Sequence, residues 1–427
     1  PDSALVAGAR RTLREIVAQK PERVYIVGDL VDEGRDADFE LARKILDEEL
    51  GDLPWTYVPG NHEIMGGPID TFHKHFGDSH TVTDLGSTRI ITLNSSTGRL
   101  NDDFDQVRML RSQLDAAEKD PGVTGVLVMF HHPTEDFLPS KASQLSDREE
   151  AALMEKWFAE FRASGKQIGV INGHVGAFHT RQSEGVIFHT NGNSGKNPSS
   201  TPDWGGWLGW TMLGVDPTVS GDAPATDWLT VETHPYVDTD SLSIVADDDV
   251  AAGDTVDLAG TLTQDGNEIP VAWPMSIRWS GEGVHVGELD DAPAGTRVVI
   301  DQRSMTATFL PTADGDVTVD LTVNGHTASH TFHIKGAPAP EDPEEPQPEE
   351  PAPQEPEPQE PAPEAPAPTE TPGTPDTGDS DTGDSDTGDS DTGDSDTGDS
   401  ESGDSEGGTD DGSDAGDDAG DDDQTAD

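Results

Sequence analysis

Residues 22–34 read Glu-Arg-Val-Tyr-Ile-Val-Gly-Asp-Leu-Val-Asp-Glu-Gly, a short apolar run followed by acidic residues. The run 24–27 predicts a buried strand that ends at Gly28 and is followed by Asp29 and Asp32. In an open α/β sheet, a carboxylate in this place reaches the crevice beyond the carboxyl edge of the strands. The stretch therefore predicts an α/β fold with a site at that edge, although Gly-Asp after a strand also occurs as a simple capped turn.

Polar residues follow three later predicted strands as well. The strands and the residues after them are 55–58 with Gly60-Asn61-His62-Glu63, 124–130 with His131-His132-Pro133, and 167–171 with Asn172-Gly173-His174. The chain has no Cys, so any metal is left to oxygen and imidazole ligands, a donor set that suits Mn, Fe, Zn or Mg. Each of these residues alone has an ordinary structural explanation, but their recurrence at successive strand ends favours a metal site.

Predicted helices alternate with these strands over the first part of the chain. Apolar residues recur at helical spacing over 2–19, 37–50 and 105–119, and Ser146 with Glu149 predicts a capping box at the start of a fourth helix. Alternating strands and helices indicate a layered α/β domain, which we expect to cover residues 1–237.

The predicted secondary structure changes to short strands of alternating apolar and polar residues over residues 238–336. Its clearest feature is a run at 317–323, then Asn324-Gly325, then a return strand to Ile334, which predicts a β-hairpin. About 95 residues of this kind predict an immunoglobulin-like β-sandwich, with Trp279 as its core aromatic residue.

Composition separates the last part of the chain from the rest. The 427 residues carry a net charge of −61, and 33 of the 86 acidic residues but none of the 25 basic ones lie in 337–427. A Pro/Glu-rich spacer (337–375) precedes a tail (376–427) that begins with five repeats of Asp-Thr-Gly-Asp-Ser, and both are expected to be disordered. The rest of the chain carries 53 acidic and 25 basic residues, and this excess of negative charge still repels nucleic acid. No apolar run is long enough to span a membrane.

The four polar motifs resemble the signature of the calcineurin-like metallophosphoesterases over about residues 1–235. The resemblance implies a layered α/β/β/α sandwich with two divalent metal ions (Mn, Fe, Zn or Mg). It implies that Asp29 bridges both ions and that Asn61, His131 and His174 each bind one. His62 would protonate the leaving-group oxygen and Asp32 would orient His62, while Glu63 would lie behind the ligands. His132 remains a second candidate beside His131.

The sequence departs from the family pattern at two places. The opening Asp-x-His of the family is absent, and because the helix 2–19 would follow that strand, we expect the chain to be truncated at its N-terminus. Gly176 stands where the closing Gly-His-x-His has its second histidine, and His179 is a candidate substitute. Glu33 occupies the position of a phosphate-gripping arginine in the protein Ser/Thr phosphatases, which argues against phosphoprotein substrates.

Together these features predict a monomeric phosphoesterase that hydrolyses a small phosphomonoester or phosphodiester by a metal-bound hydroxide, with His62 as general acid. The spacer and repeats resemble the stalks of Gram-positive surface proteins, so we expect an extracellular, cell-wall-associated protein with an attachment signal beyond residue 427. The alternative is a surface binding or adhesion protein whose phosphoesterase domain is degenerate, for which Gly176 would be the first sign.

Overall fold

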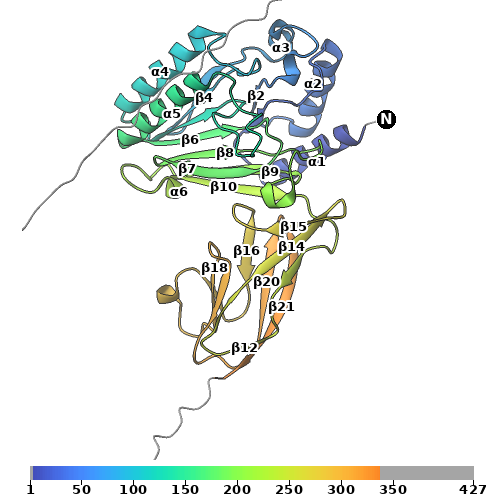
Figure 1. The fold of residues 1–427 in the computed structure, drawn as a ribbon, viewed down its shortest axis with the longest axis vertical. Helices are drawn as coiled ribbons and strands as arrows, with labels where there is room; N and C mark the ends of the chain where they lie inside the picture. Colours follow the sequence, from blue (N-terminus) through green and yellow to red (C-terminus); the bar gives the residue numbers. More distant parts are fainter. Residues whose placement is uncertain (1–2, 337–427) are drawn as a thin grey trace, which may run out of the picture. The chain divides into compact units, whose positions relative to one another are not determined.

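The largest sheet in the computed structural model, which describes residues 3–336, has six strands in the order β3-β4-β5-β6-β8-β7 (Figure 1). The inner strands β4, β5, β6 and β8 are parallel, and β3 and β7 pair antiparallel at the two edges. The six strands are β3 (Thr81–Leu85), β4 (Thr88–Thr92), β5 (Gly125–Met129), β6 (Gln167–Asn172), β7 (His179–Ser183) and β8 (Val186–Thr190). The parallel strands bring the carboxyl ends of β5 and β6 to the same edge.

Two helices, α4 (Phe104–Lys119) and α5 (Arg148–Ala163), cover one face of this sheet. Their buried side chains, among them Leu114 and Phe158, pack on sheet residues such as Val126 and Val128. Burial of each large apolar side chain contributes about 2 kcal/mol. The predicted capping box at the start of α5 is wrong: Asp147 is the N-cap, accepting hydrogen bonds from the backbone of residues 149 and 150, and Ser146 donates to a carbonyl in another loop.

The opposite face packs against a second layer of strands. Strands β1 (Val24–Val27) and β2 (Trp55–Val58) form a parallel pair, and β9 (Gly209–Val215) and β10 (Leu229–Pro235) form an antiparallel pair. Apolar residues of β1, β9 and β10 share one core with β4, β5, β6 and β8, filled by the fully buried Trp228 of the short helix α6 (Ala225–Trp228). Three helices belong to this side of the domain: α1 (Ala4–Ala18), α2 (Asp36–Leu50) and α3 (Ile69–Phe76).

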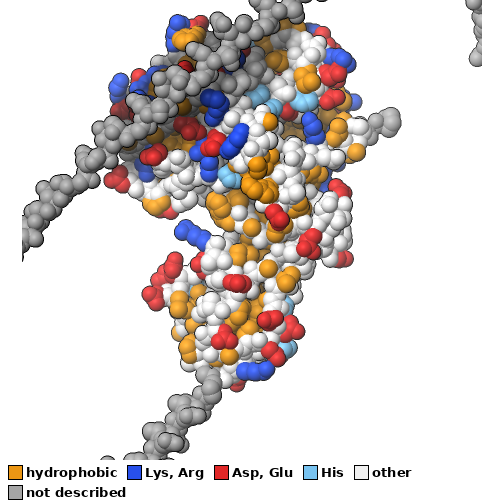
Figure 2. Space-filling model, viewed as in Figure 1, with side chains coloured by type: hydrophobic (Ala, Val, Ile, Leu, Met, Phe, Trp, Pro, Cys, Tyr) orange, Lys and Arg blue, Asp and Glu red, His pale blue; other side chains and the backbone are white. Residues whose placement is uncertain are grey.

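The predicted helices and strands of this part are confirmed within one or two residues, and α3 is an addition. The domain is therefore a mixed α/β domain, as expected. On the face shown in Figure 2, acidic and basic side chains of its surface lie side by side. Within the domain, oppositely charged side chains form ion pairs, such as Arg10 with Glu49 at 2.7 Å and Arg181 with Glu155 at 2.7 Å.

Residues 243–335 are rich in β-structure and contain no α-helix. The predicted hairpin is confirmed: β20 (Gly315–Val323) and β21 (His326–Lys335) pair antiparallel around Asn324 and Gly325, both with positive φ. Trp279 is 6% exposed and lies in the core of this region. Its other strands are β11 (Ser243–Val245), β12 (Asp249–Ala251), β13 (Thr255–Asp257), β14 (Ala259–Gln264), β15 (Asn267–Val271), β16 (Ile277–Ser280), β17 (Val284–Val286), β18 (Val298–Asp301) and β19 (Thr306–Phe309).

The β-rich region and the α/β domain lie within one structural unit and share core residues. Phe178 and Trp207 of the α/β domain belong to the same buried cluster as Trp279. The side chain of Gln264 bonds to the backbone of Leu208 in both directions and donates to the carbonyl of Tyr236. The domain boundary near residue 237 stays a prediction.

The spacer 337–375 and the tail 376–427 lie outside the described residues. Among the helices that the structure describes, none is long and apolar enough to cross a membrane.

Candidate metal centre at the strand ends

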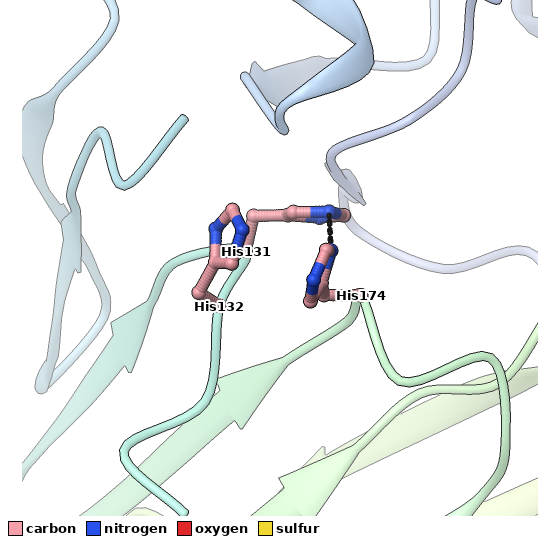
Figure 3. Close-up of side chains that lie close together, drawn as sticks. All are labelled: His131, His132 and His174. Carbon is pink, nitrogen blue, oxygen red and sulfur yellow. Dashed lines mark hydrogen bonds between the residues drawn. The ribbon is translucent and has the colours of Figure 1, made fainter. Parts of the chain in front are cut away.

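Four predicted site residues follow four different strands: Asp29 after β1, Asn61 after β2, His131 after β5, and His174 after β6. We call these four residues the strand-end cluster. The strands belong to two sheets, which the domain core packs face to face. Asp29 Oδ2 lies 3.1 Å from His131 Nε2, which lies 3.1 Å from His174 Nδ1. Figure 3 shows His131 and His174 coming from neighbouring strands and meeting at this contact.

The backbone is strained at two members of the strand-end cluster. Asp29 has a φ of 58° and His174 a φ of 66°, in the left-handed region that non-glycine residues seldom adopt. Each such residue costs of order 1–3 kcal/mol, and such residues concentrate at functional sites. Gly60 also has a steric role, because a Cβ there would lie 2.3 Å from Asp29 Oδ1 and 2.8 Å from His131 Nε2. The site therefore requires glycine at position 60.

His131 is held by its backbone surroundings. Its Nδ1 lies 2.7 Å from the carbonyl oxygen of Val27, which fixes Nδ1 as the donor and directs Nε2 toward Asp29 and His174. Burial lowers the pKa of His131, but the hydrogen bond and charge of Asp29 outweigh burial and the pKa is raised. Burial likewise acts to raise the pKa of Asp29, and His131 and His62 hold it well below its usual value. The two side chains thus form a close pair, with Asp29 Oδ2 3.1 Å from His131 Nε2.

Asn61 offers an acceptor that no donor among the described residues satisfies. Its Oδ1 is buried without a hydrogen-bond partner within residues 3–336, a state that costs about 1–3 kcal/mol. Asn61 stands between Gly60 and His62, which both adjoin Asp29, and an amide oxygen, a carboxylate and two imidazoles are a donor set that suits a divalent cation of the Mn, Fe or Zn type. The residues present therefore fit a bound metal ion.

His132 lies beside the strand-end cluster. Ligand nitrogens of His131, His132 and His174 all lie within 4.8 Å of one another (Figure 3). The His132 ring is 3.9 Å from the His174 ring, and its backbone N–H donates to Ser95 Oγ at 2.9 Å. Burial, followed by the charge of the neighbouring histidines, lowers the pKa of His132 to about 2 and that of His174 to about 4. Both rings are neutral near pH 7, as ligands must be.

Glu63 supports the site from behind. The side chain is fully buried, and its oxygens accept hydrogen bonds from the backbone N–H of Asp29 at 2.9 Å, Leu30 at 3.0 Å and Gly60 at 2.5 Å. The hydroxyl of Tyr57 also donates to it. Burial and then the charge of Asp29 raise the pKa of Glu63. With its oxygens occupied in this way, Glu63 joins the loops after β1 and β2.

His62 opens the short 3₁₀ turn η1 (His62–Ile64) next to Asp29. Its backbone N–H donates to Asp29 Oδ1 at 3.2 Å, and its Nδ1 lies 2.6 Å from the backbone carbonyl of Asp32. The Asp32 carboxylate is 3.8 Å away and 90% exposed, so the closer contact of His62 is with the Asp32 carbonyl, and the orienting role of the carboxylate stays a prediction. His62 Nε2 points to Lys196 Nζ at 3.5 Å, a neighbour that no sequence motif predicts.

The loop after β6 does not place His179 with the other histidines of the site. His179 is the first residue of β7, where its ring stacks on Phe137 at 4.1 Å, and it is not in the histidine group of the described residues. Gly176 has a φ of 74°, and a Cβ there would lie 2.3 Å from Ser199 Oγ. A side chain at the family's second histidine position would therefore require Ser199 to shift and would strain the backbone.

His189 is a further buried histidine that no sequence motif marks. His189 in β8 is fully buried and lies 2.9 Å from the hydroxyls of both Thr180 and Thr211. Thr211 in turn donates to Asn191 Oδ1 at 2.7 Å, at the start of the loop that carries Lys196. His189 and Ser95 stand in no motif, so only their contacts in the fold connect them to the site.

A model of the calcineurin-like phosphoesterase family matches residues 6–183. The matched range contains the whole strand-end cluster and also His62, Glu63 and His132. No curated protein matches the chain.

Solved structures that match include GAP50, the anchor in the inner membrane complex of Plasmodium, at 10% identity and a TM-score of 0.34, over 55% of this chain and 81% of that one. A 5'-nucleotidase from Candida albicans matches at 10% identity and a TM-score of 0.33, over 55% of this chain and 46% of that one. The phosphopantetheinyl hydrolase PptH from Mycobacterium tuberculosis matches at 14% identity and a TM-score of 0.28, over 42% of this chain and 87% of that one. The match thus spans less than half of the nucleotidase. Scores this low carry no argument about substrate.

Proposed function

We propose that this chain, whose residues 6–183 match the calcineurin-like phosphoesterase family model, is a member of that family and hydrolyses phosphomonoesters or phosphodiesters with the strand-end cluster as its metal site. The family suggests metal-dependent phosphoester hydrolysis, and the donor set is compatible with it. A bound divalent ion supplies two effects: it lowers the pKa of water and neutralises charge on the phosphoryl group.

The observation that carries this proposal is the meeting of Asp29, His131 and His174, together with the Oδ1 of Asn61, which is buried without a hydrogen-bond partner among the described residues. These residues come from four strand ends, and two of them have strained backbones. A purely structural cluster would satisfy the buried Asn61 oxygen with a donor. A cation satisfies that oxygen and the converging nitrogens at once.

In the proposed reaction His62 gives a proton to the leaving-group oxygen. Its Nδ1 is held by the Asp32 carbonyl, so Nε2 is the atom free to carry that proton. The backbone N–H of His62 bonds to Asp29, which fixes the imidazole at one side of the strand-end cluster. Glu63 keeps the two loops in place and has no direct part in the chemistry.

The test is turnover of bis-p-nitrophenyl phosphate by the full chain with added Mn²⁺. We expect hydrolysis that a chelator abolishes and that His62→Ala lowers by about 10²-fold or more, the usual contribution of general acid catalysis. His326→Ala, a histidine of the β-rich region, serves as the matched control and should leave the rate unchanged. Activity that survives chelation, or that is the same in His62→Ala, would contradict the proposed mechanism.

The second candidate is a binding protein with a degenerate phosphoesterase domain. It is favoured by Gly176, where a histidine side chain would clash with Ser199 unless Ser199 moved. Complete absence of turnover with Mn²⁺, together with retained cation binding, would support this candidate over the enzyme.

We further propose an extracellular protein held at the cell wall, with an immunoglobulin-like fold for the β-rich region and the acidic tail as a stalk. This proposal rests on the composition of residues 337–427 and on the hairpin and buried Trp279 in the β-rich region. Fractionation of the source cells with an antibody to residues 238–336 tests it, and recovery of the chain in the cytosol alone would refute it.

A further inference from the structure

Lys196 lies at the rim of the site. Its Nζ lies 3.5 Å from His62 Nε2, and within residues 3–336 it forms no ion pair with a carboxylate. Several other lysines of the described part do form such ion pairs, including Lys74 with Asp36 at 2.6 Å and Lys141 with Glu135 at 3.1 Å. In a chain with this excess of acidic residues, a lysine directed at an imidazole is a site ready for an anion.

The loop that carries Lys196 is anchored on both sides. Asn193 donates to the carbonyl of Asn197 at 2.9 Å and accepts from the backbone of Gly209 at 3.0 Å, which closes the turn around Lys196. The carbonyl of Ser194 accepts from the hydroxyl of Tyr236 at 3.0 Å. Beyond the lysine, the N–H of Ser199 donates to the carbonyl of Gly176 at 3.1 Å, in the loop of His174. The Lys196 backbone therefore keeps a fixed distance from the strand-end cluster.

The basic side chain of the loop after β1 is engaged elsewhere and does not take the place of Lys196. Arg35 lies near the loop after β1 but pairs with Glu33. Within the described residues, Lys196 is the basic side chain for which a contact with His62 or the strand-end cluster is recorded. An ammonium is a strong donor to phosphate or carboxylate oxygens.

We propose that Lys196 is a substrate-binding residue that holds an anionic leaving group beside His62. This inference rests on the proposed function, because His62 marks the leaving-group side only if it is the general acid. It assigns to the site phosphate esters and anhydrides whose leaving group carries its own negative charge, such as a nucleoside diphosphate that releases a nucleoside monophosphate. Esters with a neutral leaving group would gain nothing from Lys196.

The first test measures binding in the absence of added metal, which prevents turnover of AMP, itself a phosphomonoester, and it uses AMP and adenosine as probes of the leaving-group side. Calorimetry on the full chain without metal should give tighter binding of AMP than of adenosine. Lys196→Ala should weaken AMP binding about tenfold and leave adenosine unchanged, while Lys196→Arg keeps most of the affinity. The control is Lys119→Ala, since Lys119 is exposed at the end of α4 that precedes β5, at the edge of the sheet opposite the site.

The second test separates this inference from the proposed function. In an active enzyme, Lys196→Ala should raise KM for ADP about tenfold and leave KM for p-nitrophenyl phosphate within about twofold. AMP binding that depends on Lys196 supports the inference even if no substrate is turned over. Equal AMP affinity in wild type and Lys196→Ala, or no AMP binding at all, overturns the inference even if phosphoesters are hydrolysed.

Discussion

The carboxylate of Glu63 is the residue on which the geometry of the site depends most. It is fully buried, yet it satisfies backbone N–H groups of two loops that would otherwise be left without partners beneath the strand-end cluster. Asp29 has its strained backbone in this position because Glu63 accepts from its N–H. A residue that touches no substrate can therefore control where the proposed ligands lie.

Glu63→Ala should lower the free energy of unfolding by about 3 kcal/mol or more, because it leaves several buried donors unsatisfied. Urea unfolding of the full chain measures the loss. Glu118→Ala, an exposed residue of α4, is the control and should stay within about 0.5 kcal/mol of wild type. A loss below about 1 kcal/mol for Glu63→Ala would show that the loops do not depend on this carboxylate.

His189 should make the stability of the domain depend on pH. Burial lowers its folded pKa to about 3, whereas the unfolded pKa is 6.5, so below pH 6.5 the unfolded chain binds a proton that the folded chain does not. Above pH 6.5 both states are neutral and the effect vanishes. Between pH 7.5 and 5.0 this one group should remove about 2 kcal/mol of stability. The His189→Gln variant should lose about 2 kcal/mol less stability than the wild-type protein over the same pH interval. Equal pH dependence of stability in the two proteins would refute the assignment.

The site residues that could be predicted from the sequence are those that follow a strand directly. Asp29, Asn61 and His131 stand next to apolar runs, and parallel strands bring such positions to one edge. Ser95, His189 and Lys196 could not be predicted, because their relation to the site comes from contacts between distant segments. The predicted role of Asp32 toward His62 stays a prediction, because His62 Nδ1 lies 2.6 Å from the Asp32 backbone carbonyl and 3.8 Å from its carboxylate.

At the scale of elements, the loop between β6 and β7 decides what the site can hold. It turns back at Gly176 in the left-handed region and packs against Ser199, so the chain passes the family's second histidine position with its backbone alone. His179, only five residues after His174, is carried into β7. The strand and helix ranges were predictable from periodicity, but this loop shape was not, because it depends on a partner loop from far along the chain.

Gly176→Ala should destabilise the domain through two effects, a backbone cost of about 1 kcal/mol and a clash with Ser199. The double variant Gly176→Ala/Ser199→Gly should regain the part of the stability that the clash with Ser199 removes. Gly77→Ala is the control for the backbone cost alone, since Gly77 has a φ of 84° with no atom within 4 Å of the added Cβ. If Gly176→Ala and Gly77→Ala cost the same, the packing against Ser199 is not tight.

At the scale of the molecule, the α/β domain and the β-rich region share a core. Phe178 and Trp207, which stack on one another at 3.9 Å, belong to the same buried cluster as Trp279. The hairpin residue Asn324 donates to Glu15 of α1 at 3.2 Å and to the carbonyl of Pro235 at 2.8 Å. An α/β domain cut off at residue 237 would expose this core, so the two regions should unfold together.

Gln264→Ala removes three hydrogen bonds that join the two regions and should lower the free energy of unfolding by about 2 kcal/mol. Tryptophan fluorescence and circular dichroism, followed in the same urea titration of the full chain, should report one shared transition. The exposed Gln182 supplies the control, Gln182→Ala, which should be neutral. Two separate transitions in the wild-type protein would contradict the coupling.

The most direct test of the whole account is calorimetric titration of the full chain with Mn²⁺. If the strand-end cluster is a metal site, the wild-type chain binds Mn²⁺ with a defined stoichiometry, Asn61→Ala and His131→Ala each weaken binding at least tenfold, and His326→Ala binds as wild type does. Wild-type protein that binds no Mn²⁺ at that site, or binding that Asn61→Ala and His131→Ala leave unchanged, would contradict the account.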